Sequence, residues 1–590
     1  MDFLSPIFTE KAECQDCYKC LRECSVKAIR VEGGHAAVVP ELCVLCGHCV
    51  RVCPVGAKRV RNDLPRARRL LELGVPVAVS LAPSWSAEYP GLEPGQLVAA
   101  LRRLGFTVVS ETAVGADLVA RRLAGDYLEA RAAPVAAGGR KRGSIVISSA
   151  CPTAVEHLKK YHPAIASRVS DMRSPLLAHA TFLKERLGPS SRVVIIGPCI
   201  SKKRESDARP DLIDVAIDFK DLADWFESLG IEPGAMVPTP EDSFYPGRAA
   251  KGALFPIEGG MIASIRKYGP PEGVHWMSFS GISEIDRALA GLEAGGAAEL
   301  EAAGEDIFLE LLACPGGCIN GPRCKDRDGT IAKRLSVQDY AETAEPQGLV
   351  SEVELGYDWD IAPVPVAEPS PDLILAALRK TGKYGIEDEL NCGGCGYDTC
   401  RDFARAMVGG RAEAAMCLSY MRKLAQKKAN GLLRAIPSGV VIVDRELRVV
   451  ECNRAFASLL GADIEALWDT KPGLEGAELD RLVPFHRYFA EVLEGSAAIE
   501  RDMRFDKRML HGTIFGIERG AFAGGVFQDV TSPWIRKDRV VTKARDVIQQ
   551  NLAVVQKIAF LLGENAAETE AILSSIIDSF DDGTEGGEER

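Results

Sequence analysis

Eight cysteines near the N-terminus repeat one spacing. Residues 14–24 follow the pattern C-x2-C-x2-C-x3-C, and residues 43–53 repeat it with Pro54 directly behind. This interleaved repeat is typical of ligands to [4Fe-4S] clusters, because thiolates bind iron and the short spacing lets several of them face one cluster. Structural zinc is the alternative, but zinc sites rarely use eight cysteines in this arrangement. The front of the chain is therefore expected to transfer electrons.

The repeat is that of bacterial two-cluster ferredoxins, in which the fourth cysteine of each group binds the cluster of the other group. We expect a ferredoxin-like domain with two [4Fe-4S] clusters over residues 1–70. The spacing predicts one cluster held by Cys14, Cys17, Cys20 and Cys53, and a second held by Cys43, Cys46, Cys49 and Cys24.

A further group of cysteines lies far downstream, in the stretch CGGCGYDTC and the helical stretch after it. Its members are Cys392, Cys395, Cys400 and Cys417. Glycines between them let backbone amides approach cluster sulfurs. The segment resembles a small [4Fe-4S] domain, expected over residues 372–425. A zinc knuckle stays open, because four cysteines alone do not choose between zinc and iron-sulfur.

Between residues 74 and 345, short β-rich runs alternate with helical patterns, which predicts an α/β domain with mostly parallel sheets. The runs GSIVISSACP and SRVVIIGPC both end in a turn that contains a cysteine. Carboxyl ends of strands are where open α/β sheets build their sites. One metal centre could therefore collect Cys151, Cys199, Cys314 and Cys318, although each of them alone would more often be a buried core thiol.

Three segments of this region resemble the signature segments of the [FeFe]-hydrogenase catalytic domain, in the same order: SSACPTAVEHLKKYHP, GPCISKKRE and ELLACPGGCING. LAPS (81–84) and IEGGM (257–261) resemble further pocket segments of that family. The resemblance covers roughly residues 1–345, with the ferredoxin-like front end included. It implies an H-cluster, in which Cys151, Cys199, Cys314 and Cys318 hold a [4Fe-4S] cluster and Cys318 bridges to a diiron subsite with CO, CN and dithiolate ligands.

The resemblance also assigns residues around the diiron subsite. The positions that match the cyanide-binding contacts of the family are Ala82, Pro83, Ser84 and Lys202. Anionic cyanides in a dry pocket need charge or hydrogen-bond partners, and a lysine ammonium supplies both. Gly197 and Leu312 stand where the family carries two methionines against the subsite.

Ala150 departs from the family at the first step of proton transfer. The family segment reads T-S-C-C-P, and its first cysteine passes protons between the pendant amine of the dithiolate and a chain of acids. A methyl group can neither give nor accept a proton. Arg122 and Leu123 stand where two relay acids are expected. The predicted cluster ligands are thus present, whereas the first groups of the proton-transfer path are missing. This combination favours a site that binds dihydrogen but turns over slowly, which suits a sensor.

The C-terminal half supports this interpretation. Beyond a Pro-rich linker (346–371), the stretch LLRAIPSGVVIVDRELRVVECNRAFASLLG resembles the start of a PAS sensory domain, expected over residues 426–533 with a short helix that opens at Asn453. Cys452 is expected to be a half-buried strand residue. Apolar spacings of four and three predict an amphipathic helix over 534–580 that packs within the chain or on a partner, and residues 581–590 are predicted to be a disordered acidic tail.

Composition agrees with a multidomain protein that combines α+β and α/β parts. A length of 590 residues corresponds to about four domains at roughly 150 residues each. Apolar residues make up 46% and charged residues 26%, and no run approaches the roughly 20 apolar residues of a membrane span. Without a visible secretory signal we expect a cytoplasmic protein. A net charge of -12 argues against nucleic acid as partner.

These observations predict a sensory [FeFe]-hydrogenase that binds and slowly, heterolytically splits H2, and that signals through its clusters and PAS domain. Expected partners are H2 and protons, a ferredoxin-type redox partner, hydrogenase maturation proteins, a separate effector such as a Ser/Thr phosphatase or kinase, and a second copy of the chain. Two alternatives stay open. One is a catalytic hydrogenase that evolves or oxidises H2 with a non-standard proton path, and the other is a non-catalytic electron-transfer or assembly-factor-like protein without the diiron subsite.

Overall fold

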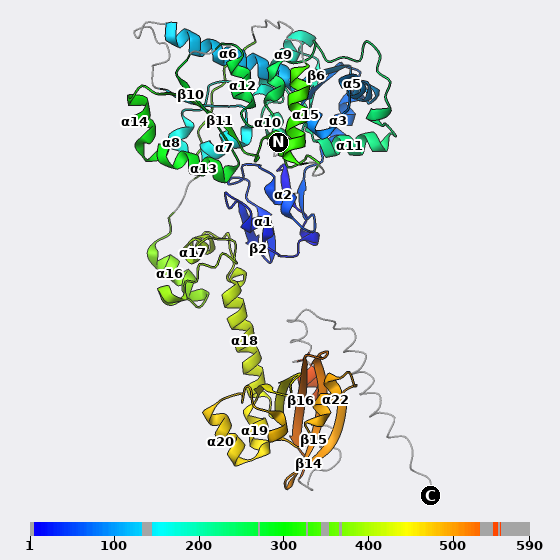
Figure 1. Cartoon of the computed structure of the whole chain (residues 1–590), viewed down its shortest axis with the longest axis vertical. Helices are drawn as coiled ribbons and strands as arrows, with labels where there is room; N and C mark the ends of the chain where they lie inside the picture. Colours follow the sequence, from blue (N-terminus) through cyan, green and yellow to red (C-terminus); the bar gives the residue numbers. More distant parts are fainter. Residues whose placement is uncertain are drawn as a thin grey trace. The chain divides into compact units, whose positions relative to one another are not determined.

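The computed structural model describes residues 5–132, 144–269, 272–325, 329–343, 353–364, 368–531, 547–552 and 555. The chain divides into two compact units, Met1–Cys417 and Leu418–Arg590. Figure 1 shows the elements of both units in sequence colours. The predicted combination of ferredoxin-like, α/β and PAS-like parts is confirmed.

The N-terminal part of unit 1 contains two antiparallel strand pairs and two short helices. The buried ammonium of Lys58 ties the strand pairs together, since its Nζ donates to Thr9 Oγ1 (2.5 Å) and to the Ala36 carbonyl (2.7 Å). The pairs are β1 (Ile7–Thr9) with β4 (Lys58–Val60) and β2 (Ile29–Glu32) with β3 (His35–Val38), and the helices are α1 (Lys19–Arg22) and α2 (His48–Val52).

The central part of unit 1 contains two parallel sheets. Apart from the edge strand β10, whose residues are partly exposed, their strands are mostly buried and apolar, as expected for parallel sheets that are covered on both faces. The first sheet has the order β6-β5-β8-β9, with β5 (Val77–Leu81), β6 (Val108–Glu111), β8 (Arg192–Ile196) and β9 (Val215–Ile217). The second has the order β10-β11-β7, with β10 (Val274–Ser280), β11 (Asp306–Leu312) and β7 (Ile145–Ile147).

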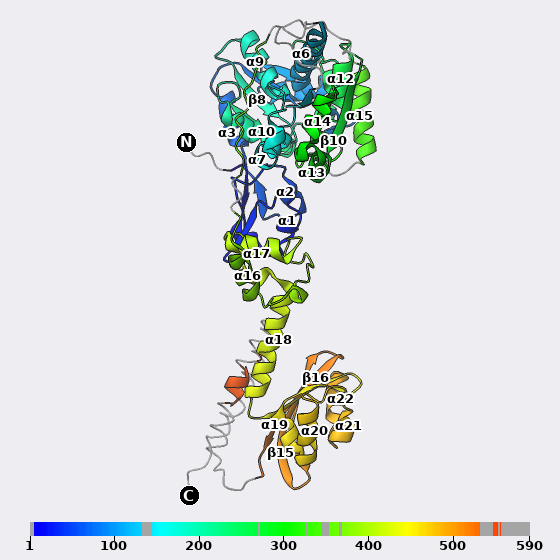
Figure 2. The same cartoon turned by 90° about the vertical axis from the view of Figure 1, so that its left-hand side faces the viewer.

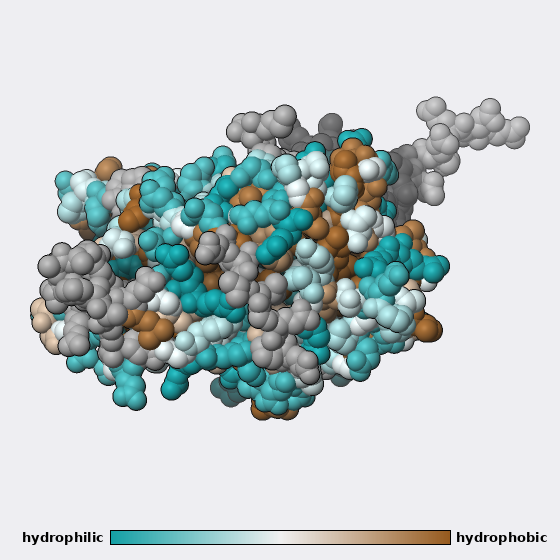
Figure 3. Space-filling view, turned by 90° about the horizontal axis from the view of Figure 1, so that it is seen from above, coloured by the Kyte–Doolittle hydropathy of each residue, from teal (hydrophilic) through white to brown (hydrophobic). Residues whose placement is uncertain are grey.

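Helices surround these sheets in both views (Figures 1 and 2). On the face seen in Figure 3, hydrophilic and hydrophobic side chains are interspersed. The helices are α3 (Leu64–Leu71), α4 (Trp85–Glu88), α5 (Pro94–Arg103), α6 (Thr112–Ala132), α7 (Pro152–Tyr161), α8 (Pro163–Ala166), α9 (Pro175–Leu187), α10 (Ser201–Ala208), α11 (Phe219–Ser228), α12 (Gly260–Arg266), α13 (Ile282–Gly291), α14 (Ala297–Ala302) and α15 (Thr330–Glu342).

One buried histidine of this core has a purely structural setting. His179 on α9 is fully buried, with Ser80 Oγ 2.8 Å from its Nδ1 and Ser110 Oγ 2.8 Å from its Nε2. Burial lowers the pKa of His179 to about 3, so the imidazole is neutral at physiological pH. Both ring nitrogens have partners, and the side chain is therefore a satisfied core group.

Part of the predicted linker 346–371 packs on the α/β part. The Trp359 indole Nε1 donates to the Ser170 carbonyl (2.8 Å), and the Tyr357 N–H donates to the Asp171 carbonyl (2.8 Å). Residues 353–364 of the predicted linker thus contact the α/β part, and the bounds 346–371 stay a prediction. Prolines marked this stretch as extended, but the two aromatic side chains supply the anchoring surface.

The remainder of unit 1 is the four-cysteine part. Its two helices are α16 (Pro371–Lys380) and α17 (Cys400–Val408), which pack through Ile374, Leu378 and Ala404. The predicted limit at residue 425 lies inside the next helix, α18 (Leu418–Ala435), which begins directly after Cys417.

Unit 2 contains one antiparallel sheet with helices packed on it. Cys452, expected to be half-buried, is fully buried because the sheet and Trp468 cover it, and the Trp468 Nε1 donates to the Cys452 carbonyl (3.2 Å). The sheet has the order β13-β12-β16-β15-β14, with β12 (Gly439–Asp444), β13 (Val449–Cys452), β14 (Ile499–Phe505), β15 (Arg508–Glu518) and β16 (Phe522–Asp529). Its helices after α18 are α19 (Arg454–Leu460), α20 (Ala462–Thr470), α21 (Leu479–Leu482) and α22 (Arg487–Leu493).

Of the predicted terminal helix 534–580, only residues 547–552 and 555 are described, and they are helical. The tail 581–590 lies outside the described residues. In the part of the chain that the structure describes, none of the helices combines the length and apolar character needed to cross a bilayer.

Asn453 joins α18 to the PAS-like sheet, and its replacement tests that connection. Its amide nitrogen donates to the carbonyls of Leu433 (3.1 Å) and Ser438 (2.8 Å), and its Oδ1 accepts from the Phe456 N–H (2.9 Å) at the start of α19. Asn453→Ala should cost about 2–4 kcal/mol of local stability, because it removes a helix cap and leaves buried polar groups unpaired. Hydrogen exchange of α18 and α19 measures this loss.

Asn453→Asp is the matched control. It keeps the oxygen that caps α19 and removes the donor to the carbonyls of Leu433, in α18, and Ser438. We expect faster exchange at the end of α18 with α19 still protected. Equal protection in all three proteins would contradict the connection.

Candidate metal centre

Three strands end just before the four cysteines of the predicted centre. β7 ends at Ile147 and leads to Cys151, β8 ends at Ile196 and leads to Cys199, and β11 ends at Leu312 and leads to Cys314 and Cys318. Within each sheet the strands are parallel, so their carboxyl ends lie at one edge. The cysteines thus come from both sheets, at the edges where sites are built.

The pKa values of these thiols show that the structure brings them together. Burial raises the pKa of Cys314 well above its ordinary value, and the thiols of Cys318, Cys199 and Cys151 raise it further. Burial likewise raises the pKa of Cys199 to about 11, with Lys202 opposing and Cys151 adding to the rise. Such mutual effects occur only between groups that lie close together. Their ligation of one cluster stays a prediction.

The donor chemistry fits the implied metal group. Four converging thiolates are unfavourable in a buried place unless a cation balances them, and iron in a [4Fe-4S] cluster does so. Ser84 in the predicted cyanide pocket is 1% exposed, and its Oγ has no hydrogen-bond partner among the described residues. A buried hydroxyl without a partner is costly, so this pocket suits a hydrogen-bonding ligand.

Lys202 is held beside the thiols by a carboxylate. Its Nζ donates to Glu205 Oε2 at 2.6 Å, and Glu205 in turn accepts a hydrogen bond from Ser174. Burial lowers the pKa of Lys202, but Glu205 and Cys199 outweigh it and hold the pKa above the ordinary value. The side chain is therefore a permanent cation next to the predicted cluster.

Ala82 and Gly197 lie against each other at the ends of β5 and β8. The Ala82 N–H donates to the Ile196 carbonyl (2.8 Å), and a Cβ added at Gly197 would lie 2.6 Å from the Ala82 Cβ. A methionine at position 197 would therefore displace Ala82. Pro83 follows in the same turn, and Leu312 is buried at the end of β11. Nothing in these contacts tests the role of Pro83 or Leu312 toward the subsite.

Ala150 sits in an apolar and partly buried place. Its N–H donates to Ser148 Oγ (3.1 Å), and its methyl packs against the apolar core that contains Met261 and Leu123. Arg122 is largely exposed and pairs with Asp126 (2.8 Å). Neither Leu123 nor Arg122 offers an acid beside Ala150.

Glu310 is an acid that the sequence analysis did not single out. It lies in β11, is 1% exposed, and accepts from the Met261 N–H (3.2 Å). Burial raises its pKa to about 7, against the opposing hydrogen bonds from the backbone of Met261 and Ile262. A lone glutamate inside the apolar run FLELL was the available signal. Such a carboxyl can hold and release a proton near neutral pH.

The eight N-terminal cysteines separate into the two predicted sets. Burial raises the pKa of Cys20, Lys58 opposes the rise, and Cys17, Cys14 and Cys53 add to it. Burial likewise raises the pKa of Cys49 well above its ordinary value, and Cys46, Cys43 and Cys24 add to the rise. Cys53 thus lies with the first set and Cys24 with the second, as the crossed ligand pattern requires.

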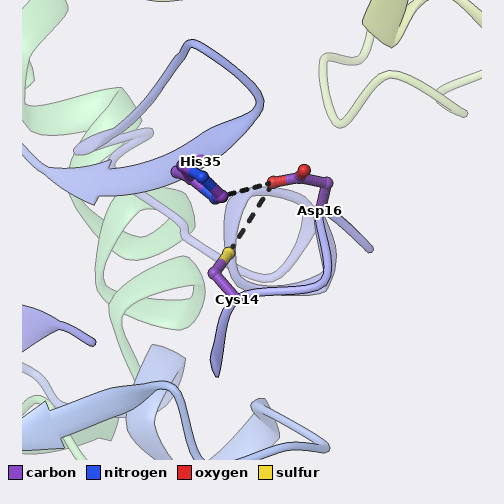
Figure 4. Close-up of side chains that lie close together, drawn as sticks. All are labelled: Cys14, Asp16 and His35. Carbon is purple, nitrogen blue, oxygen red and sulfur yellow. Dashed lines mark hydrogen bonds and ion pairs between the residues drawn. The ribbon is translucent and has the colours of Figure 1, made fainter. Parts of the chain in front are cut away.

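An acidic neighbour distinguishes the first set. Figure 4 shows the Asp16 carboxylate facing both Cys14 and His35, with Asp16 Oδ1 3.8 Å from Cys14 Sγ and 3.7 Å from His35 Nδ1. The ligand atoms of all three residues lie within 4.8 Å of one another. A carboxylate here would favour the oxidised form of a cluster, and the trio could also hold zinc if the cluster were missing.

The second set lies next to the predicted H-cluster site. Gly47, between Cys46 and Cys49, has φ +75°, and a Cβ added there would lie 2.6 Å from both Ile200 and Pro322. Burial and three nearer thiols raise the pKa of Cys314, and Cys46 adds a further rise. Only glycine fits this backbone conformation and this contact. The ferredoxin-like part is thereby seated against the residue that follows Cys199.

The four-cysteine group lies on the other side of the ferredoxin-like part. The Val31 N–H donates to the Arg411 carbonyl (3.0 Å), and the Gly33 N–H donates to Glu413 (2.8 Å). Burial raises the pKa of Tyr397 to about 12; Arg411 opposes this rise, while Cys395 and Cys24 add to it. Tyr397 therefore lies near both Cys395 of the four-cysteine group and Cys24 of the second ferredoxin-like set.

Three of these four thiols influence one another. Burial raises the pKa of Cys395, and Cys417 and Cys392 raise it further. Cys400 is buried at the start of α17, and its N–H donates to Asn391 (2.7 Å). Lys383, which is 4% exposed, donates from Nζ to Cys417 Sγ (3.2 Å). A buried ammonium on one sulfur is a feature that the cysteine spacing did not reveal.

We predict that Lys383→Met lowers the reduction potential of the cluster bound by this group. Loss of a hydrogen bond and a positive charge disfavours the more negative, reduced state, and a change of about 1.4 kcal/mol corresponds to roughly 60 mV for one electron. An EPR-monitored redox titration of the full chain measures the shift. Lys380→Met, on the exposed side of α16, and Lys383→Arg are the controls, and an unshifted Lys383→Met would refute the prediction.

Family models match four segments of the chain. Together the fold and the grouped thiols define an iron-sulfur protein with an α/β metal centre. The model of the iron only hydrogenase large subunit, C-terminal domain, matches residues 75–322, and a 4Fe-4S dicluster domain matches 13–57. An Fe-S cluster family matches 388–419, and a PAS domain matches 428–498. Residues 75–322 are therefore similar to the hydrogenase large-subunit domain, and residues 428–498 are similar to a PAS domain.

Relatives differ in how much of the chain they share. The NADP-reducing hydrogenase subunit HndD of Solidesulfovibrio fructosivorans is 28% identical over 408 residues, 58% of this chain and 69% of the relative. The cytosolic Fe-S cluster assembly factor nar1 of Aspergillus fumigatus is 34% identical over 119 residues, 19% of each protein. Among solved structures, a variant of [FeFe]-hydrogenase HydA1 from Chlamydomonas reinhardtii has 20% identity and a TM-score of 0.36, covering 48% of this chain and 91% of that chain.

Proposed function

We propose that this chain is a hydrogen sensor that binds and slowly splits H2 and passes the resulting redox state to a separate effector. The observation that carries the proposal is Ala150, an inert methyl at the position where the family resemblance expects a proton-relay thiol. When bound, the diiron subsite would supply the heterolytic chemistry. Without a proton acceptor at position 150, product protons leave slowly and turnover is low.

The chain's own residues would bind and orient the subsite. Lys202, held by Glu205 at 2.6 Å, offers a fixed positive charge, and Ser84 offers a buried hydroxyl that lacks a partner among the described residues. Both suit anionic cyanide ligands in a place that excludes water. The thiols of Cys151, Cys199, Cys314 and Cys318 would hold the attached cluster.

Electrons would then pass from the cluster bound by Cys314 to the cluster of the second ferredoxin-like set. The close contact of Gly47 with Ile200 and Pro322 holds these two sites next to each other. From there Tyr397 leads to the four-cysteine group, and α18 begins directly after Cys417. A change at that cluster would thus reach the helix that Asn453 joins to the PAS-like sheet. An effector such as a Ser/Thr phosphatase or kinase would read the PAS-like domain, provided that H2 favours one conformational state.

Ala150→Cys tests the missing proton step. Restoring a thiol should raise H2 turnover of the matured protein by about tenfold or more, since a positioned acid-base group commonly contributes 10²–10⁴-fold and the relay acids further out stay absent. Gas-exchange assays or protein-film electrochemistry measure this rate. Ala150→Val, which adds bulk without a transferable proton, should leave it unchanged or lower.

Infrared spectroscopy separates the proposal from its rivals. Matured protein should show CO and CN stretching bands that shift under H2. CO and CN bands whose frequencies do not change under H2 would contradict the sensing proposal. Complete absence of bands after maturation would favour the assembly-factor-like alternative, to which the nar1 match lends support.

A catalytic hydrogenase with another proton path is the second candidate, and Glu310 favours it. A buried carboxyl with a pKa of about 7 lies against Met261, whose sulfur accepts from Ser148 Oγ (2.9 Å), the same hydroxyl that accepts from the Ala150 N–H. Protons could leave the site on this side of β11.

Glu310→Gln tests that path. In the wild type, the infrared band of a protonated carboxyl should disappear as pH rises through about 7, because burial raises the pKa of Glu310 to about 7. The variant should lose this band, and on the second candidate its H2 turnover should fall by about tenfold or more. The control is Glu305→Gln, because the Glu305 side chain is exposed and pairs with His275 on the surface. A lost band with unchanged turnover would reject the alternative path.

A further inference from the structure

A second group of metal-binding side chains lies apart from the cysteines. His157 on α7 and His162 directly after it face Asp286 on α13, and Glu293 lies in the π-helical segment Leu292–Gly296 that continues α13. We call these four residues the His–Asp cluster. His157 is almost fully buried, whereas 41% of the Asp286 side chain is exposed. The cluster is thus buried on one side and open to solvent on the other.

Three ligand atoms of the His–Asp cluster converge on one point. His157 Nε2 and His162 Nε2 are 3.3 Å apart, and Asp286 Oδ1 lies 2.5 Å from the former and 2.9 Å from the latter. A tetrahedral zinc ion at about 2.0–2.1 Å from each donor separates its ligands by about 3.3 Å. The two imidazoles already have this separation. Asp286 needs to withdraw by less than about 1 Å, which its exposed side chain allows.

The orientation of the two imidazoles is that of metal ligands. His162 Nδ1 lies 2.8 Å from Glu293 Oε1, so the Nδ1 hydrogen has a carboxylate acceptor and the lone pair of Nε2 is left facing the other two atoms. A carboxylate behind a ligating histidine is the usual support of a metal site.

His157 Nδ1 is buried without a hydrogen-bond partner among the described residues. In the tautomer that binds a metal through Nε2, the ring hydrogen is on Nδ1, so His157 lacks the carboxylate support that Glu293 gives His162.

The occupant that competes with a metal is a proton. Hydrogen bonds with Asp286 hold the pKa of His162 above its ordinary value, although burial lowers it, and Glu293 adds to the rise. Burial would raise the pKa of Asp286, but His157 and His162 hold it below its ordinary value. A divalent cation would have to displace this proton, and it would then take all three ligand atoms at once.

We propose that the His–Asp cluster binds one divalent first-row metal ion, with zinc as the expected occupant, through His157, His162 and Asp286. Two imidazoles and one carboxylate are a donor set that zinc accepts, and the exposed side leaves a fourth position for water. The ion would fix the last turn of α7 to α13.

This helix connects two of the predicted cluster sites. α7 starts directly after Cys151, and at its other end Lys160 Nζ donates to the Cys43 carbonyl (2.9 Å) and Tyr161 OH donates to the Leu42 carbonyl (2.6 Å). A metal bound by His157 and His162 would therefore fix the C-terminal end of α7, which is hydrogen-bonded to the loop that contains Cys43. Its role is mechanical and does not depend on H2 chemistry.

The test is metal analysis of the full chain with its iron-sulfur clusters assembled. After exposure to micromolar zinc and gel filtration, we expect about one zinc per chain, with X-ray absorption showing nitrogen and oxygen neighbours at about 2.0–2.2 Å. His162→Gln and Asp286→Asn should lose this zinc while the iron content stays unchanged. Glu293→Gln should keep the ligands and weaken zinc binding by about 10–100-fold.

His275→Gln is the matched control. His275 pairs with Glu305 at 2.8 Å on the surface of the same α/β part, and among the described residues it belongs to no cluster of metal-binding side chains. This variant should keep the zinc. In the zinc-free variants, hydrogen exchange in the last turn of α7 should be faster than in the wild type.

Three results would overturn the proposal. Zinc with sulfur neighbours at about 2.3 Å would place it at cysteines such as Cys14. Zinc that survives both His162→Gln and Asp286→Asn would place it elsewhere. No retained zinc in folded, iron-replete wild type would mean that protons alone occupy the His–Asp cluster.

Discussion

Buried sulfur is the constraint on which the structure depends. Thiols from both parallel sheets meet at the strand ends, where burial and mutual repulsion raise the pKa of Cys314 and Cys199. Metal binding requires the thiolate forms, which are unfavourable here unless iron neutralises them, so cofactor binding and folding of this region are coupled. The same holds for the N-terminal and the four-cysteine groups. Most of the architecture of unit 1 can be understood as the support for these sulfurs.

Polar groups around the sulfurs differ from centre to centre. Lys202 stands beside Cys199, Lys383 donates to Cys417, and Asp16 lies beside Cys14. Cations favour the reduced form of a nearby cluster and carboxylates favour the oxidised form. Three of the four cysteine groups thus differ in their electrostatic setting, which would favour directional electron flow between clusters bound there.

Spacing along the chain predicted much of this, because three cysteines within seven residues can hardly avoid facing one another. The strand-end cysteines and the parallel sheets were also readable, since apolar β-rich runs ended in cysteine turns. Contacts between distant segments were not. Asp286 lies 124 residues from His162, and Lys383 lies 34 residues from Cys417, so no local pattern joins them. Prolines in the predicted linker 346–371 indicate an extended segment, but no local pattern indicates that Tyr357 and Trp359 contact the α/β part.

The close contact of Gly47 with the α/β part restricts which ferredoxin-like domains could replace residues 1–70 of this protein. Ile200 and Pro322 leave no space for even a methyl group there, and the backbone of Gly47 adopts φ +75°. A ferredoxin module grafted from elsewhere would need glycine at this point and the same neighbours opposite it. The contact of Gly47 with Ile200 and Pro322 therefore ties the ferredoxin-like part to the α/β part. Replacing the ferredoxin-like part would require matching changes on both sides of this contact.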